Sequence, residues 1–305
     1  MLSADIQTAN LPHFPLDYRA CGVLVHVTSL PSPYGIGDLG PSAFAWIDHL
    51  CKAGQTWWQA LPGGPTGYAN SPYQSLSSFA GNWLLISPDR LIEDGLLLKS
   101  DCEGLSFSAN TVDYDAVIRF KDRLLDIAWF SFVSGERRDL GTAYEVFCHD
   151  HARWLSAYAL FGALKARYHG TYYLDWPIEL VERRPSALVQ ARRELAREID
   201  KVSFAQFLLF RQADQLKQYA HAKDVRLIGD LPFFVSPDSS DVWTDPEFFC
   251  WTNGADRASS QECPPTISVR MGSAGGIRFM IGTPFAGPAI VGALTVCAPC
   301  SRTWM

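Results

Sequence analysis

Short apolar runs alternate with longer amphipathic segments in the first part of the chain. The run from Gly22 to Val27 predicts a buried strand, and the run from Thr56 to Leu61 predicts a second one. Between them, residues 42–53 repeat apolar side chains at helical spacing and are followed by Gly54, a frequent helix stop. This order of strand, helix and strand predicts two parallel strands joined by a packed helix.

The middle of the chain has a helical pattern. Amphipathic spacing predicts helices at residues 90–98, 114–134, 142–168, 185–199 and 203–222. A third apolar strand is predicted from Arg226 to Val235, so a large helical insertion, about residues 88–200, separates the second strand from the third. This α/β pattern suits a β/α barrel with a subdomain grafted onto its loops, because a regular α/β sheet uses shorter connections.

Composition and charge narrow the functional classes. The chain has 305 residues, of which 48% are hydrophobic and 19% charged, values typical of a soluble globular protein. Its formal net charge of -6 and the absence of a basic run argue against a nucleic-acid partner. Residues 1–15 contain no apolar signal-peptide core, so we expect a cytoplasmic protein, and the eight scattered cysteines predict reduced thiols.

The most informative segment is the loop from Gly67 to Asn82, which follows the second predicted strand and the Pro-Gly-Gly-Pro turn at residues 62–65. A polar loop that leaves a strand through such a turn is a common place for a binding site. The loop holds Tyr68, Tyr73 and Phe79 among hydroxyls and amides, and it contains no charged residue. Aromatic rings among neutral hydrogen-bonding groups predict a sugar site, because sugars offer apolar ring faces and hydroxyls.

Asp230 is the second candidate, because it lies inside an apolar strand pattern at the carboxyl end of the third predicted strand. Active-site residues of a β/α barrel lie at this end of its strands. The alternative for Asp230 is a turn or capping role. For Asp238 and Asp241, which follow closely, we expect positions in a solvated loop or at a helix N-cap.

Other patterns have simpler interpretations. Residues 35–40 match G-x-G-x-x-G, but no acid ends the second strand, so we predict a tight turn that caps the first helix. His149 and His151 are two positions apart in a helical pattern and predict a solvated face instead of a metal pair. Cys297 and Cys300 lack a second metal-binding pair. The uncharged run from 279 to 300 keeps open a tail-anchored membrane protein, although its prolines weaken a spanning helix.

Three long blocks of sequence resemble the amylomaltase family, the 4-α-glucanotransferases of glycoside hydrolase family 77. These blocks are residues 22–40, residues 67–82 with their flank 84–87, and residues 228–243. The resemblance runs through about residues 19–252. It implies the N-terminal part of a TIM (β/α)8 barrel and a transferase that moves α-1,4-glucan segments between maltodextrins by a retaining covalent mechanism.

The resemblance also implies site residues and partners. Ser71 and Tyr73 match the family's substrate loop, and Asp230 matches the aspartate of its first conserved barrel motif, which would hydrogen-bond sugar hydroxyls near the cleavage point. The expected partners are maltooligosaccharides and other α-1,4-glucans, with no nucleic acid, and a membrane is disfavoured. No metal or organic cofactor is expected.

The end of the chain departs from the family pattern. The family's nucleophile in an R-x-D-H motif, its acid/base Glu and a further Asp do not occur here, and residues 257–305 hold one acidic residue, Glu262. Residues Glu262 to Met271 can be encoded by codons that, when read from the third base, give V-P-P-D-Y-F-S-P-D. This is the start of the family's next block. We therefore hypothesise a frameshift near Asn253 to Ala255.

These observations predict two regions. Residues 1–252 would form a partial, incomplete barrel of three strands with the helical insertion, and residues 253–305 would be an out-of-frame, disordered tail. Because no catalytic carboxylate is present, we predict that this chain is an inactive 4-α-glucanotransferase. The alternatives are a non-catalytic glucan-binding fragment and the tail-anchored membrane protein.

Overall fold

A parallel three-stranded sheet lies at one end of the molecule. The structure, a computed structural model, describes residues 18–135, 138–230, 234–249 and 267–268. The sheet has the order β1 (Gly22–Leu24), β2 (Trp57–Gln59) and β3 (Arg226–Ile228), and Trp58 is paired with Val23 on one side and Leu227 on the other. The predicted parallel pairing of the first two strands is therefore confirmed.

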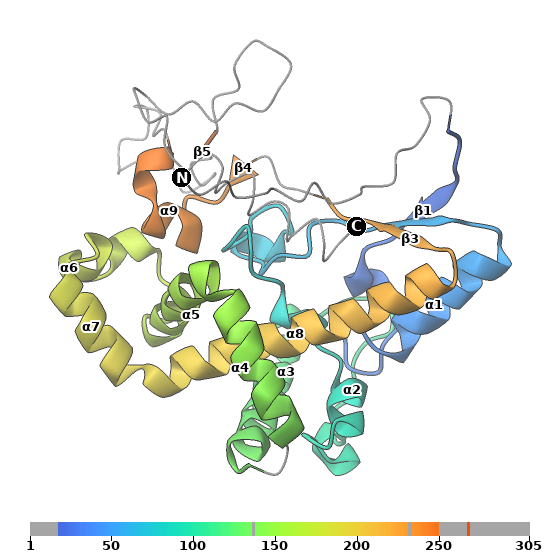
Figure 1. Cartoon of the computed structure of the whole chain (residues 1–305), viewed down its shortest axis with the longest axis horizontal. Helices are drawn as coiled ribbons and strands as arrows, with labels where there is room; N and C mark the ends of the chain where they lie inside the picture. Colours follow the sequence, from blue (N-terminus) through green and yellow to red (C-terminus); the bar gives the residue numbers. More distant parts are fainter. Residues whose placement is uncertain (1–17, 136–137, 231–233, 250–266, 269–305) are drawn as a thin grey trace, which may run out of the picture.

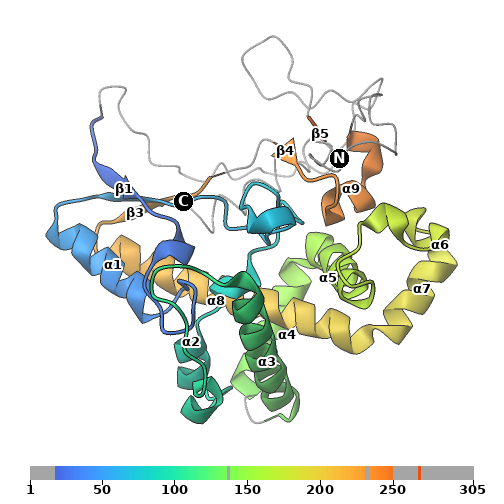
Figure 2. The ribbon, with the colours of Figure 1, turned by 180° about the vertical axis from the view of Figure 1, so that it is seen from behind.

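Two helices cover one face of this sheet (Figures 1 and 2). They are α1 (Pro41–Lys52) and α8 (Ala196–Ala222), and their apolar faces form one core with Trp58 and Leu227. Side chains alternate between the two faces of a strand. On the other face, Leu24 is 53% exposed and Ile228 37% exposed.

The segment between β2 and β3 is helical, as predicted. It contains α2 (Pro88–Glu93), α3 (Tyr114–Val133), α4 (Arg138–Asp150), α5 (Ala152–Arg167), α6 (Ile178–Val181), α7 (Pro185–Glu194) and α8. Short 3-10 turns occupy Val27–Ser29, Tyr68–Asn70, Trp83–Leu85, Lys99–Cys102, Tyr173–Asp175 and Pro246–Phe248. A second apolar core, built around Phe161, Trp176 and Trp243, joins α5, α6 and α7 to α9 (Ser240–Thr244). Because α8 spans 27 residues, one helix links this part to the sheet.

Several predicted boundaries are wrong. The helices predicted at 185–199 and 203–222 meet at Leu195, because α7 ends at Glu194 and α8 begins at Ala196, and the helix predicted at 90–98 ends at Glu93. The helix predicted at residues 142–168 is broken at His151, whose ring lies against Phe147 with the centroids 4.5 Å apart. The strand predicted to run to Val235 stops at Ile228, and β4 (Phe234–Val235) pairs antiparallel with β5 (Ile267–Ser268) instead. Pro232, in the sequence between β3 and β4, has no N–H and disfavours a continuous strand.

The helices of the described residues include none that is both long and apolar enough to cross a membrane. The uncharged run at 279–300, the cysteine pair at 297 and 300, and the proposed frameshift near 253–255 lie outside the described residues. The predicted disordered tail also lies outside them, apart from the two residues of β5.

Candidate functional site

The loop from Gly67 to Asn82 begins as a narrow hairpin at the carboxyl end of β2. Thr66 and Ser75 form an antiparallel bridge at its base. Two residues of the turn, Ala69 and Asn70, have left-handed backbones with φ of 54° each. A non-glycine residue rarely adopts this conformation, so two in succession indicate a turn imposed by its surroundings.

The second half of the loop is fastened to α8 and α9. The side-chain amide of Gln206 accepts a hydrogen bond from the Gly81 amide over 2.8 Å and donates one to the Gly81 carbonyl over 2.9 Å. Asp241 Oδ2 accepts from the Ser78 amide over 2.7 Å. Burial raises the pKa of Asp241, although hydrogen bonds from Ser78 oppose the rise. These contacts give the loop a fixed base.

Asp238 and Asp241 are therefore not the solvated or capping residues that the sequence predicted. Asp238 pairs with Lys165 Nζ over 2.6 Å and accepts from the Tyr173 amide over 3.3 Å. The N-cap of α9 is instead Ser239, whose hydroxyl accepts from the Val242 amide over 3.3 Å. Both carboxylates hold neighbouring segments together.

The three predicted site residues are connected. The Tyr73 hydroxyl donates to Asp230 Oδ2 over 2.8 Å, and the Tyr73 amide donates to Ser71 Oγ over 3.3 Å. Tyr73 is 48% exposed, so much of its ring remains open to solvent. The hydrogen bond to Asp230 raises the pKa of the Tyr73 hydroxyl, since a nearby carboxylate favours the neutral phenol.

This arrangement offers an exposed ring beside a carboxylate. A carboxylate accepts hydrogen bonds from hydroxyl groups, and an aromatic ring can cover an apolar face of a ligand. The described residues contain no group of three or more His, Cys, Asp or Glu side chains arranged to hold a metal ion. The site is thus suited to bind and orient a hydroxyl-rich molecule.

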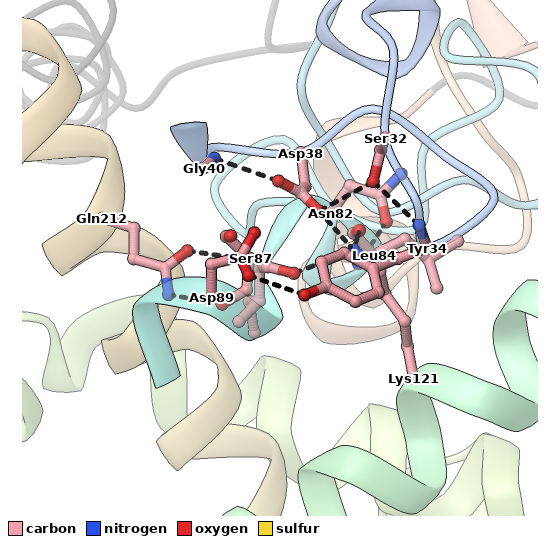
Figure 3. A network of polar contacts seen from close by, with 11 residues as sticks. Ser32, Tyr34, Asp38, Gly40, Asn82, Leu84, Ser87, Asp89, Lys121 and Gln212 are labelled. Atoms are coloured by element: carbon pink, nitrogen blue, oxygen red, sulfur yellow. Dashed lines mark hydrogen bonds and ion pairs between the residues drawn. The ribbon is translucent and has the colours of Figure 1, made fainter. Parts of the chain in front are cut away.

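A buried ion pair that the sequence did not predict holds the segment that follows this loop (Figure 3). Lys121 Nζ donates to the carbonyls of Leu84 and Ile86 over 2.6 and 2.8 Å and lies 3.4 Å from Asp38 Oδ2. Burial lowers the pKa of Lys121 and raises that of Asp38, while their mutual attraction opposes both shifts. The signal in the sequence was a lysine next to Phe120 on the apolar face of a predicted helix.

The glycine-rich segment at 35–40 is a packed turn, as predicted. Asp38 Oδ1 accepts from the amide of Gly40, the N-cap of α1, over 3.0 Å. A Cβ at Gly37 would lie 2.0 Å from the Val27 carbonyl oxygen, so the backbones approach too closely for any side chain. The glycines of this segment allow close packing of the backbone, and its acidic residue, Asp38, is hydrogen-bonded within the protein.

His26 is a further polar residue at the carboxyl end of β1 that the sequence analysis did not select. Its buried Nδ1 has no hydrogen-bond partner among the described residues, and burial lowers its pKa. Like Asp230, it follows a strand of the parallel sheet. The carboxyl edge of the sheet therefore carries a polar residue besides the three that the sequence predicted.

The fold and the site define an α/β protein with polar residues at the carboxyl edge of a parallel sheet. The family model of 4-alpha-glucanotransferases matches residues 25–272, so the chain belongs to that family, glycoside hydrolase family 77. The match extends past residue 252, the boundary expected from the sequence.

Several relatives agree with this assignment. The chain is 43% identical to a 4-alpha-glucanotransferase of Synechocystis sp. over 77% of its own length and 47% of the relative's. The corresponding protein of Thermus thermophilus is also 43% identical, over 76% and 46%. An amylomaltase from Streptococcus agalactiae, solved in complex with acarbose, matches with a TM-score of 0.73 and 35% identity over 77% of this chain and 48% of that one. The chain spans about half the length of the curated relatives it matches.

Proposed function

We propose that Ser71, Tyr73 and Asp230 are the α-1,4-glucan-binding residues of a 4-α-glucanotransferase site whose catalytic carboxylates this chain lacks. The observation that carries the proposal is the Tyr73–Asp230 hydrogen bond, which joins the loop from Gly67 to Asn82 to the carboxyl end of β3. The amylomaltase similar to this chain was solved with acarbose, which supports a carbohydrate ligand. On this proposal the described strands are the first three of a (β/α)8 barrel.

Tyr73 and Asp230 have distinct roles in this proposal. The Asp230 carboxylate accepts hydrogen bonds from sugar hydroxyls, while the exposed Tyr73 ring covers an apolar face of the sugar. Their contact holds both groups in one orientation before the glucan arrives, which reduces the ordering that binding requires. The Ser71 hydroxyl accepts a hydrogen bond from the Tyr73 amide and so helps to hold Tyr73 in place.

The chemical steps need groups outside these three residues. In a retaining transfer, a carboxylate attacks the anomeric carbon while a second carboxyl protonates the leaving oxygen. The 4-hydroxyl of an acceptor sugar then displaces the carboxylate and returns its proton to the second group. The family's R-x-D-H motif is absent from the 305 residues, so we propose that this chain does not perform the transfer itself.

A frameshift accounts for the absence of that motif. Resequencing the gene across the codons for Asn253 to Ala255 tests this part of the proposal. We expect a base inserted or lost there relative to a continuous family frame. Clean reads that keep the present frame intact would reject the frameshift.

The alternative is that the chain's own function is glucan binding without catalysis. It is favoured by the Tyr73–Asp230 contact, because the structure forms this contact in a chain that covers 47% of the Synechocystis relative. Calorimetric titration of the chain with maltoheptaose tests both candidates at the site. We expect binding that Tyr73→Ala abolishes and that Phe130→Ala, a matched aromatic truncation at a residue 68% exposed on α3, preserves. Equal binding by both variants would place the glucan elsewhere.

A further inference from the structure

A groove of about 330 Å³ opens on the helical part of the molecule, and Tyr73 is not among its lining residues. It is bounded by α4, the start of α5 and α8, and its lining includes Phe147, His151, Phe210 and Asp214. None of the contacts described for the Tyr73 site involves these residues. The groove is therefore separate from the proposed substrate site.

The groove lies on the side of α8 that faces away from the sheet. Phe210, Asp214 and Gln218 recur at intervals of four residues and share one face of this helix. Leu209 and Leu216 point in nearly the opposite direction and are buried in the core with the strands.

One wall of the groove is aromatic. Phe210 lies 5.5 Å from Phe147 and 5.4 Å from His151 between ring centroids, and Trp154 lies 5.7 Å from Phe210. Phe147, His151 and Phe210 are only partly buried. Contacts at these distances hold the rings in fixed orientations and form a continuous apolar surface.

The groove also has a polar part, which offers no strong anion site. The Arg211 guanidinium is bound to the Asp94 carboxylate through two nitrogens, one of them over 2.9 Å. Gln215, Gln218 and Asp214 supply amide donors and a carboxylate acceptor. A ligand with many hydroxyls and no charge matches this set.

His151 adds a directed donor. Its Nδ1 accepts a hydrogen bond from Trp154 Nε1 over 3.3 Å, and burial lowers its pKa, which favours the neutral ring. In a neutral imidazole whose Nδ1 accepts, the proton resides on Nε2. The ring therefore combines a stacking face with one N–H donor.

We propose that this groove is an accessory binding site for an α-1,4-glucan chain. Sugar rings would stack on Phe210 and His151, and their hydroxyls would bond to Asp214, Gln215 and Gln218. The choice of glucan as ligand rests on the proposed function, whereas the location rests on the groove itself. A second site would hold a long glucan on the molecule while another part of it occupies the Tyr73 site, and this raises the effective concentration at that site.

Affinity electrophoresis of the 305-residue chain in gels with increasing amylose tests the proposal. The groove variant is Asp214→Ala with Gln218→Ala, both exposed residues. Its matched control is Glu198→Ala with Gln190→Ala, which removes the same charge and one amide from exposed positions on α8 and α7. We expect the apparent Kd for amylose to rise about fivefold in the groove variant and to stay unchanged in the control.

The variant Tyr73→Ala distinguishes a failure of the accessory site from a failure of the proposed function. If Tyr73→Ala weakens retardation and the groove variant migrates like the unmodified chain, the accessory site is rejected and the proposed function stands. If only the groove variant weakens retardation, the accessory site stands and the glucan role of Tyr73 is rejected. A chain that amylose does not retard at all rejects both.

Tryptophan fluorescence gives a second readout, because a glucan in the groove should change emission in the unmodified chain and not in Trp154→Phe.

Discussion

The Tyr73 hydroxyl donates a 2.8 Å hydrogen bond to Asp230 across a separation of 157 residues in the sequence. Tyr73 belongs to the loop that follows β2, and Asp230 follows β3, the strand paired with β2. Neighbouring parallel strands end at the same edge of a sheet, so residues that follow them lie close together. The bond makes one site from two segments that the helical insertion separates.

Asp230→Asn should lower the pKa of the Tyr73 hydroxyl toward its ordinary value. The charged carboxylate favours the neutral phenol, and an amide oxygen keeps the acceptor but not the charge. Tyrosine titration by NMR, with the Tyr73 signal assigned from Tyr73→Phe, measures the shift. An unchanged pKa would mean that the two side chains are not in contact in solution.

Lys121→Met should destabilise the protein by about 3–5 kcal/mol, because it leaves the buried Asp38 carboxylate without its ion partner. The control is Lys201→Met, which breaks ion pairs with Asp122 and Asp126, residues more than half exposed. The control should cost less than about 1 kcal/mol. Urea unfolding measures both, and similar losses in the two variants would show that the buried pair has no special weight.

Gly37→Ala and Gly141→Ala should change stability in opposite directions. A Cβ at Gly37 meets the Val27 carbonyl oxygen at 2.0 Å, so we expect a loss of about 1–3 kcal/mol. At Gly141, within α4, a Cβ meets nothing within 4 Å, and alanine should add about 0.5–1 kcal/mol through helix propensity. The same urea experiment compares them. A tolerated Gly37→Ala would argue against the packed-turn interpretation of residues 35–40.

The three strands and two of the site residues were indicated by local pattern, but the contact between those residues was not. Apolar runs and Gly54 indicated β1, α1 and β2, because burial and helix endings leave short-range signals. The break at His151 was missed, and its ring contacts Phe210, which is far along the chain. Loop composition indicated Tyr73 and strand position indicated Asp230, yet their hydrogen bond depends on strand order, which no local pattern encodes.

The free energy of unfolding at alkaline pH should depend on Tyr173. Burial and the nearby Asp238 raise the pKa of this phenol from its ordinary value of 10.0 to about 12. Between these values the unfolded chain loses a proton that the folded chain keeps, so stability falls as pH rises. Tyr173→Phe should reduce that fall by about 1.4 kcal/mol per pH unit.

The measurement for Tyr173 is urea unfolding at a series of pH values. Below pH 9 the variant and the unmodified chain should have parallel pH profiles, which serves as the internal control. Parallel profiles continuing to pH 12 would contradict the raised pKa.

Glucose release from maltotriose by the purified 305-residue chain tests the central claim most directly. The claim is that the chain holds the glucan-recognition residues of a 4-α-glucanotransferase and lacks the carboxylates of the transfer. Disproportionation moves a glucan segment from one maltotriose to another and leaves glucose behind. We predict no glucose above the buffer blank. Release above the blank that is proportional to protein concentration would contradict the account.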